Sequence, residues 1–178
     1  RRFGRVRADT IPAVPLCTGP AAVDALHAAH LRTDLVVSAE LLGVAQRCLD
    51  GTVEYVGQRV QFGRTIGSFQ AVKHRLADLL SAVELTRSAV YGAAWQLAAA
   101  PGVRQTGIDL AVAAALARQT AADVTRAAIQ LHGGIAITWE HWAHHYYRRA
   151  HAVLAVTGSA ARHRHRLAAL MAGDDHAR

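Results

Sequence analysis

The sequence is poor in cysteine and lacks long apolar runs, and both shortages narrow the class of protein. Two cysteines among 178 residues support no disulfide framework, so a reducing, cytoplasmic location is expected. No apolar run reaches the roughly 18 uncharged residues that a membrane helix needs, and no signal peptide is recognisable. The sequence therefore predicts one domain of ordinary size, with its own core and no membrane partner.

Acidic residues are also scarce, with 13 Asp and Glu against 20 Lys and Arg, so the formal net charge is +7. Such basicity admits nucleic acid, membrane headgroups or a phosphate-bearing cofactor as partners. The densest basic run, RHRHR at 162–166, has no recognition motif or aromatic stacking platform beside it. A solvated helix face is the favoured interpretation of this run, and no nucleic-acid partner is expected.

Proline is nearly absent after residue 20, and alanine is abundant there. This composition favours helix over residues 23–172. Residues 1–22 hold three of the four prolines, together with Arg1, Arg2, Arg5 and Arg7. They are predicted to be an extended segment, either a linker or a remnant of a preceding β-domain, and residues 173–178 a short tail.

Apolar residues recur every three or four positions along three long segments, which places one apolar face on each helix. The segments run from Val36 to Val60, from Phe69 to Leu97 and from Leu110 to Leu131. A fourth segment reaches about Leu170 and is expected to break near Gly158. The pattern predicts an all-α protein, an antiparallel four-helix bundle with a short extended N-terminal segment.

Helix ends are predicted from local signals. Thr106, with Asp109 three residues later, is typical of a cap for the third helix, and Thr138 is expected to cap the fourth. Gly133 and Gly134 are expected to end the third helix, because glycine tolerates the left-handed conformation found there.

Two turn sequences combine groups suited to a phosphorylated or planar ligand. In RVQFG, residues 59–63, Arg59 offers a fork of donors that matches phosphate oxygens, and Phe62 offers a ring. In QLHGG, residues 130–134, paired glycines expose backbone N–H groups and Gln130 can bond an amide or a ribose. Taken singly, each is more often an ordinary turn or helix stop.

Histidines and tryptophans gather towards the C-terminal end. His141 and His145 are one helical turn apart, a spacing that can place two zinc ligands on one face. No carboxylate or cysteine ligand follows at a fixed spacing, so no metal site is predicted. The aromatic residues of ITWEHWAHHYY, 137–147, exceed what one bundle can hide, which predicts a face buried against another copy or a homologous subunit.

Together the two turn motifs resemble the C-terminal helical domain of the acyl-CoA dehydrogenases. The resemblance covers about residues 24–170 and rests on three stretches, AELLGVAQRCLD, YVGQRVQFGRTIGSFQAVKHRLADL and AIQLHGGIAITWEHWAHHYYRRA. Members of this family are FAD-dependent oxidoreductases that convert the α–β bond of an acyl-CoA to that of an enoyl-CoA. They dimerise, and commonly pair into tetramers, through this bundle.

The resemblance implies half of an FAD site that faces a neighbouring subunit. Arg59 and Gln61 would meet the pyrophosphate, and Phe62 would pack on the cofactor. The other implied cofactor-binding residues are Gln70 nearby and, along the ADP part, Gln130, Gly133 and Gly134. In the family, a helical domain and a β-domain precede this one and hold most of the flavin and CoA pocket. This sequence is expected to hold neither of these domains, apart from the strand-like residues 1–16.

The family's proton-abstracting glutamate is missing from the matching positions. The usual position is Thr157, and the position used by some relatives corresponds to Thr33, whereas a threonine hydroxyl cannot act as a carboxylate does at neutral pH. Asp34 is adjacent to Thr33 but points about 100° away on a helix. No catalytic residue is therefore predicted in this chain, although Asp34 or a histidine stays open as a substitute.

The leading interpretation is part of a flavoenzyme, of the type in which a homologous partner subunit carries the glutamate in a dimer or heterotetramer. An acyl-CoA would reach the complex, with a fatty acid or a steroid side chain as its acyl part, and an electron-transfer flavoprotein is a candidate acceptor. The first alternative is a non-catalytic oligomerisation module. The least favoured alternative is a basic nucleic-acid binder.

Overall fold

The computed structural model describes residues 4, 7–9 and 11–173, and within them almost every element is helical. The five α-helices are α1 (Pro20–Gln58), α2 (Gln70–Ala99), α3 (Arg104–His132), α4 (Trp142–Thr157) and α5 (Ala160–Ala172). The short elements are the strands β1 (Val60–Gln61) and β2 (Arg64–Thr65) and the 3-10 turns η1 (Ile66–Ser68) and η2 (Gly133–Ile137). The predicted all-α bundle is confirmed, including a fourth helix that is divided at Gly158.

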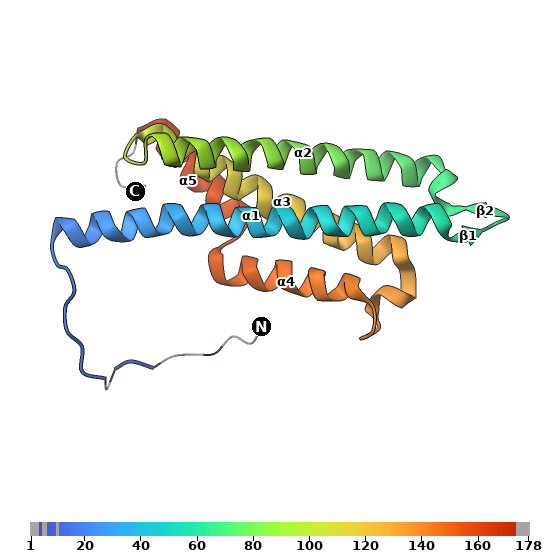
Figure 1. Cartoon of the computed structure of the whole chain (residues 1–178), viewed down its shortest axis with the longest axis horizontal. Helices are drawn as coiled ribbons and strands as arrows, with labels where there is room; N and C mark the ends of the chain where they lie inside the picture. The colour runs from blue at the N-terminus through green and yellow to red at the C-terminus, as the bar shows by residue number, and fades with distance from the viewer. Residues whose placement is uncertain (1–3, 5–6, 10, 174–178) are drawn as a thin grey trace.

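The three long helices run antiparallel, and α3 lies at the centre in contact with α1, α2, α4 and α5 (Figure 1). Its central position follows from its composition, because small alanine side chains let neighbouring helices approach closely. Ala113, Ala117 and Ala121 have no exposed surface. Larger side chains such as Val83 of α2 and Leu41 of α1 fill the space around them, as the apolar stripes predict.

Both predicted threonine caps are wrong. The Thr106 hydroxyl donates to the Ala100 carbonyl oxygen at 2.5 Å, and α3 begins after Val103 with no side-chain cap. The Thr138 hydroxyl donates to the Ile135 carbonyl oxygen at 2.9 Å, because η2 occupies the residues before it and delays the start of the next helix. His141 caps α4 instead, and its Nδ1 accepts the Ala143 N–H at 3.2 Å.

Glycines end two helices as predicted. Gly133 closes α3 with φ 70°, and Gly158 separates α4 from α5 with φ 94°. Both values lie in the left-handed region that favours glycine. At the other end of the chain, α1 begins at Pro20, three residues earlier than predicted, with proline in the first turn where its missing N–H is tolerated.

Residues 7–9 and 11–19 contain neither helix nor strand, and this segment loops away from the bundle (Figure 1). Residues 1–3, 5, 6 and 10 of the predicted N-terminal segment, which include Arg1, Arg2 and Arg5, lie outside the described residues, as does the tail beyond Gly173. Its origin as part of a preceding domain stays a prediction. No helix among the described residues is long and apolar enough to cross a membrane.

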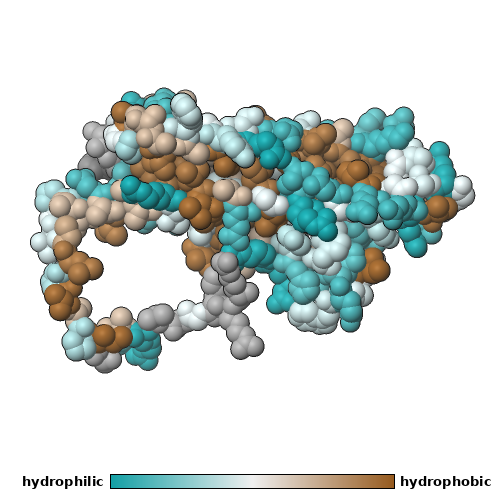
Figure 2. Space-filling view, in the orientation of Figure 1, coloured by the Kyte–Doolittle hydropathy of each residue, from teal (hydrophilic) through white to brown (hydrophobic). Residues whose placement is uncertain are grey.

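The face formed by α1 and α2 exposes large apolar side chains (Figure 2). Tyr91 is 68% exposed, Trp95 78% and Val36 67%. A groove of about 630 Å³ runs between the two helices beside them. Such a contiguous apolar surface is typical of a protein–protein contact.

Candidate functional site

The connection between α1 and α2 is a two-stranded hairpin that projects past the end of the bundle (Figure 1). Its tip residues Phe62 and Gly63 have φ values of 53° and 75°. Two positive φ values in succession match a tight hairpin turn whose twist fits the flanking strands. A bulky residue rarely adopts this conformation, and backbone strain of this kind clusters at functional positions.

The strained turn holds the Phe62 ring out in solvent. The side chain is 91% exposed, with only an edge-on contact to Phe69 at 6.2 Å between ring centroids. Arg59, Gln61 and Gln70 are exposed beside it. Arg59 ends α1, and its backbone carbonyl accepts the Ile66 N–H at 2.8 Å, which closes the hairpin. The hairpin thus presents a ring, a guanidinium and two amides to whatever meets this end of the molecule.

The second predicted turn is equally open. Gln130, Gly133 and Gly134 are exposed, and a Cβ added at either glycine would meet nothing within 4 Å. Steric crowding therefore does not explain why glycine occupies either position. Gly133 is required by its positive φ, whereas Gly134 leaves backbone open to a close approach.

The two turns lie at the same end of the bundle because the ends of α1 and α3 are tied together. The Tyr55 ring stacks on His132 with 4.3 Å between centroids, and its hydroxyl donates to the His132 carbonyl oxygen at 3.3 Å. The predicted hairpin and glycine residues are thereby brought to one end of the structure (Figure 1). Sequence reasoning missed Tyr55 and His132, although both sit inside the quoted motifs.

A histidine and tryptophan cluster supports the glycine turn. The Trp142 ring meets His132 edge-on with 5.1 Å between ring centroids and stacks on His141 with 5.3 Å between them. The Arg47 guanidinium lies 5.0 Å from the Trp142 ring centroid. Burial lowers the pKa of His132, against a hydrogen bond from its Nδ1 to the Ala128 carbonyl. Burial also lowers the pKa of His141, with the neighbouring histidines adding to the shift.

Both shifts disfavour the charged form of these two histidines. Within the described part of the chain, no group of three or more His, Cys, Asp or Glu side chains is arranged to hold a metal ion.

The expected base position lies elsewhere, at the end of α4. The Thr157 hydroxyl donates to the Val153 carbonyl at 2.9 Å and accepts from Arg118 Nη2 at 3.1 Å. Arg118 has no exposed surface, and its Nε and Nη1 donate to the carbonyls of Gly158 at 3.0 Å and Ala114 at 3.1 Å. Thr157 is therefore anchored to a buried cation.

Asp34 belongs to the same buried cluster. Its Oδ2 accepts from Arg166 at 2.7 Å, and its Oδ1 lies 3.6 Å from Arg118 Nη2. Thr33 points elsewhere, with its exposed hydroxyl donating to the Ala29 carbonyl at 2.8 Å. The predicted difference in direction between Thr33 and Asp34 is confirmed. Asp34 serves as counter-ion to two arginines.

His163 completes the cluster without forming a catalytic triad. Its Nε2 meets the Thr157 carbonyl oxygen at 3.4 Å, and its Nδ1 lies 3.9 Å from Asp34 Oδ2. Burial lowers its pKa, and the charge of Arg118 adds to that shift. The Thr157 hydroxyl is bonded to Val153 and Arg118 instead of to the imidazole, so no nucleophile is activated. This cluster was not predicted, because its members come from four helices.

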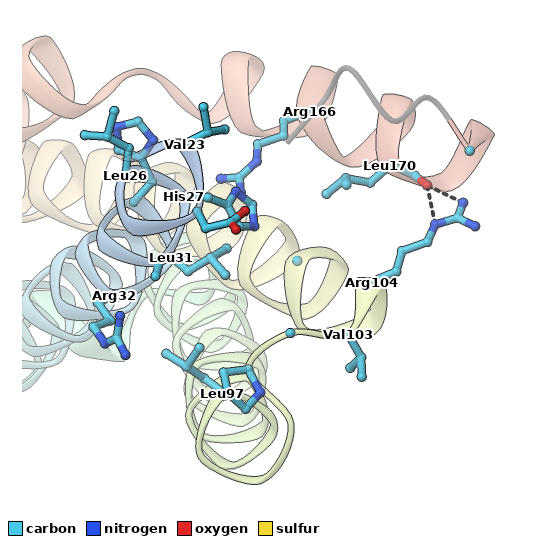
Figure 3. Close-up of a pocket in the computed structure, with 17 residues that line it drawn as sticks. Val23, Leu26, His27, Leu31, Arg32, Leu97, Val103, Arg104, Arg166 and Leu170 are labelled. Atoms are coloured by element: carbon cyan, nitrogen blue, oxygen red, sulfur yellow. Dashed lines mark hydrogen bonds between the residues drawn. The ribbon is translucent and has the colours of Figure 1, made fainter. Parts of the chain in front are cut away.

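A cavity at the opposite end of the bundle contains none of the predicted cofactor residues. It measures about 790 Å³ and is lined by the start of α1, the α2–α3 turn and the end of α5. Figure 3 shows Arg166 reaching from α5 towards α1, and Arg104 donating to the Leu170 carbonyl oxygen, with Nε 2.9 Å from it. Both arginines are thus already engaged within the chain. The predicted cofactor residues lie on an open surface, and their part in cofactor binding stays a prediction.

The chain belongs to the acyl-CoA dehydrogenase family, because the model of the acyl-CoA dehydrogenase C-terminal domain matches residues 29–172. Acyl-CoA dehydrogenase IpdE2 of Mycobacterium tuberculosis is 42% identical over 85% of this chain and 42% of its own length.

Two solved structures have the same fold. A chain of the ChsE4-ChsE5 complex from Mycobacterium tuberculosis shares 34% identity over 80% of this chain and 38% of its own, with a TM-score of 0.76. A chain of a Tcur3481-Tcur3483 steroid ACAD variant shares 31% identity over 87% and 41%, also with a TM-score of 0.76. The chain therefore spans about two fifths of the length of these relatives.

Proposed function

We propose that this chain supplies the helical bundle and half of an FAD site to an acyl-CoA dehydrogenase-like flavoenzyme that oxidises an acyl-CoA to the enoyl-CoA. The observation that carries the proposal is the meeting of two open turns at one end of the bundle. They present an exposed arginine, amides, a strained exposed phenylalanine and bare glycine backbone. These groups fit the phosphates, ribose and rings of a dinucleotide.

Each predicted residue has a distinct task in this proposal. The Arg59 guanidinium and the Gln61 amide bind pyrophosphate oxygens, and the Phe62 ring packs on the cofactor from a neighbouring subunit. Gln70 lies at the edge of the hairpin. Gln130 and the backbone of Gly133 and Gly134 line the ADP part. A flavin held there would supply the acceptor for the electrons removed from the acyl-CoA, and the chain's own residues would bind and orient it.

The base comes from a homologous partner subunit in a dimer or heterotetramer. Proton abstraction from carbon needs a group that is ionised near neutral pH and free to reach its substrate. Thr157 does not ionise there, and Asp34 is held by Arg118 and Arg166. The paired proteins among the solved relatives, one of them a steroid ACAD, support this arrangement. The steroid ACAD among them favours a CoA ester of a steroid side chain as the substrate, ahead of other acyl-CoAs.

The resemblance to the family also supports a location and an electron acceptor for this complex. The complex works in the cytoplasm and passes electrons to an electron-transfer flavoprotein. A further chain with this fold comes from a structure of the electron transferring flavoprotein of Acidaminococcus fermentans, which supports such an acceptor. The segment before α1 is a linker or the remnant of a preceding β-domain, and the bundle runs from Pro20 to Ala172.

The test uses the full-length protein purified with its partner. The native complex should show a flavin absorbance band near full occupancy, whereas residues 1–178 alone should hold FAD weakly or not at all. Arg59→Ala should weaken FAD binding by on the order of 1.5 to 3 kcal/mol, the typical contribution of a charged phosphate contact. Arg164→Ala, an exposed arginine on α5, is the matched control. Equal flavin retention in both variants would refute the half-site.

A second candidate is a non-catalytic oligomerisation module, and the exposed apolar face of α1 and α2 favours it. It predicts a stable assembly that lacks a flavin band and is indifferent to Arg59→Ala. The absorbance spectrum of the native complex therefore separates the two candidates.

A further inference from the structure

Arg118 lies directly beneath the turn at which the family usually carries its catalytic base. One nitrogen, Nη2, lies 3.1 Å from Thr157 Oγ1 and 3.6 Å from Asp34 Oδ1. The other nitrogens hold the carbonyls of Gly158 and Ala114. A side chain at position 157 and the carboxylate at position 34 thus meet the same guanidinium.

The charges around Arg118 do not balance. Asp34 of α1 is the one carboxylate that the structure describes in the cluster, against Arg118 of α3 and Arg166 of α5. Arg162, also on α5, adds positive charge near Arg118. Burial lowers the pKa of His163, which disfavours its charged form, and its buried Nδ1 has no hydrogen-bond partner among the described residues. A buried site with surplus positive charge favours a second carboxylate.

We propose that Arg118 is a positioning residue that fixes the α4–α5 turn, and that it would hold a carboxylate at position 157 as an ion-pair partner and prevent that carboxylate from acting as a base. Two features of this chain then oppose a base at position 157: the glutamate is missing, and Arg118 would pair with a carboxylate placed there. Only the identification of position 157 as the base position rests on the proposed function. The ion pairing rests on the geometry alone.

A carboxylate held by Arg118 would not meet the requirements of a working base. A general base must be ionised near neutral pH yet able to accept a proton, so its pKa should lie close to the operating pH. A carboxylate paired with a buried arginine has its pKa lowered, which makes it a weaker base. Asp34 would not displace the new carboxylate from Arg118, because Asp34 also pairs with Arg166 at 2.7 Å.

The experiment compares Thr157→Glu with Thr157→Gln in the full-length protein with its partner, since the two side chains match in size and differ in charge. Thermal unfolding is followed from about pH 3 to pH 8. The Glu variant should unfold several degrees above the Gln variant at neutral pH. A carboxyl with a lowered pKa contributes stability above its unfolded pKa, about 4.3 for Glu, and loses it as the pH falls through the folded pKa. The advantage should therefore begin to shrink near pH 4 and vanish once the pH lies below the folded pKa.

Arg118 is then removed to test its part. In an Arg118→Met background the advantage of Glu over Gln should disappear. If that background fails to fold, Asp34→Asn serves instead, because it removes the carboxylate that pairs with Arg118. The stability advantage of Thr157→Glu over Thr157→Gln should then grow. An advantage of the same size in every background, or a Glu variant less stable than the Gln variant at neutral pH, would overturn the ion pair.

Turnover provides the second readout, measured in complexes whose partner has lost its own base. The Glu and Gln variants should turn over at rates within about tenfold of each other, whereas a working base typically adds roughly 10² to 10⁴-fold. A gain in that range for Glu would overturn the claim that Arg118 blocks the base. FAD content is measured in the same samples, so that a change in turnover can be separated from a loss of flavin. Failure of the half-site would show in a different experiment, as equal flavin retention with and without Arg59→Ala.

Discussion

The open end of the bundle and the cluster beneath Thr157 use similar groups in opposite ways. At the open end, Arg59 and Gln61 face solvent beside an exposed ring. In the cluster, Arg118 is fully buried and is engaged by Asp34, Thr157 and backbone carbonyls. An arginine with exposed donors can recognise a ligand, whereas one whose donors are satisfied internally fixes the fold. The open end is therefore suited to binding a ligand, and the Arg118 cluster to stabilising the fold.

The largest effect is expected from removing support. Arg118→Met should destabilise the protein by about 3 to 5 kcal/mol, because it breaks the buried ion pair with Asp34 and removes the side-chain donor to Thr157 Oγ1 and to the Gly158 and Ala114 carbonyls. Urea unfolding of the full-length protein measures this. The exposed control Arg164→Ala should stay within about 0.5 kcal/mol of the wild type. Equal small effects from both changes would erase the distinction between the two regions.

Acidification should loosen the open end. The pKa of His132 and of His141 is lowered by burial, and the neighbouring histidines lower that of His141 further. Their folded pKa values lie below the unfolded value of about 6.5, so above that pH both states are neutral and stability is unaffected. As the pH falls below about 6.5, the unfolded chain takes up protons first. Stability should fall by up to about 1.4 kcal/mol per pH unit for His132, and by less for the partly exposed His141.

A variant isolates the contribution of His141. His141→Asn keeps an acceptor at the N-cap of α4 and removes the titrating group, so it should preserve stability at about pH 8 and flatten the decline on acidification. Melting temperatures at about pH 8, 6.5 and 5 check this. A decline as steep as in the wild type would show that His141 contributes nothing to the acid sensitivity.

The glycine turn offers a sharper comparison within the open end. Gly133→Ala should destabilise by about 1 to 2 kcal/mol, because φ is 70° there and an L side chain is strained in that region. Gly134→Ala should be nearly neutral for stability, since a Cβ would meet nothing within 4 Å. Chemical denaturation measures both. If Gly134→Ala nevertheless weakened FAD retention in the complex, that glycine would be a contact with the cofactor.

The smallest expected change is a gain. Phe62→Gly should stabilise the fold slightly, by up to about 1 kcal/mol, because it relieves a positive φ and removes an exposed ring. The same change should weaken FAD retention in the complex. Calorimetry and flavin content, measured on one sample, report both effects. A loss of stability would show that Phe62 supports the hairpin.

The sequence predicted the helices well because each depends on a repeated local pattern. Apolar residues every three or four positions mark α1 to α3, and Gly158 marks the division between α4 and α5. The differing directions of Thr33 and Asp34 followed from the turn of about 100° per residue alone. The caps failed for a physical reason. Threonine hydroxyls have several backbone acceptors within reach, and at Thr106 and Thr138 a preceding carbonyl is satisfied instead.

The two turns and the Arg118 cluster differ in how much of each could be predicted from the sequence. The motifs of the open end are contiguous stretches, so resemblance alone predicted their grouping. The Arg118 cluster joins Asp34, Arg118, Thr157 and Arg166, which are far apart in the chain and meet only when four helices pack. No periodicity or local motif encodes such a meeting.

The exposure of Trp95 gives the protein an intrinsic optical probe. Trp95 on the apolar face of α2 is 78% exposed and Trp139 near the glycine turn is 70% exposed, whereas Trp142 is half-buried. Indole fluorescence shifts to shorter wavelength when water leaves the ring. Association through the α1–α2 face would shift Trp95, and closure of the cofactor end would shift Trp139. Single-tryptophan variants would therefore report, without any label, which of the two surfaces a partner covers first.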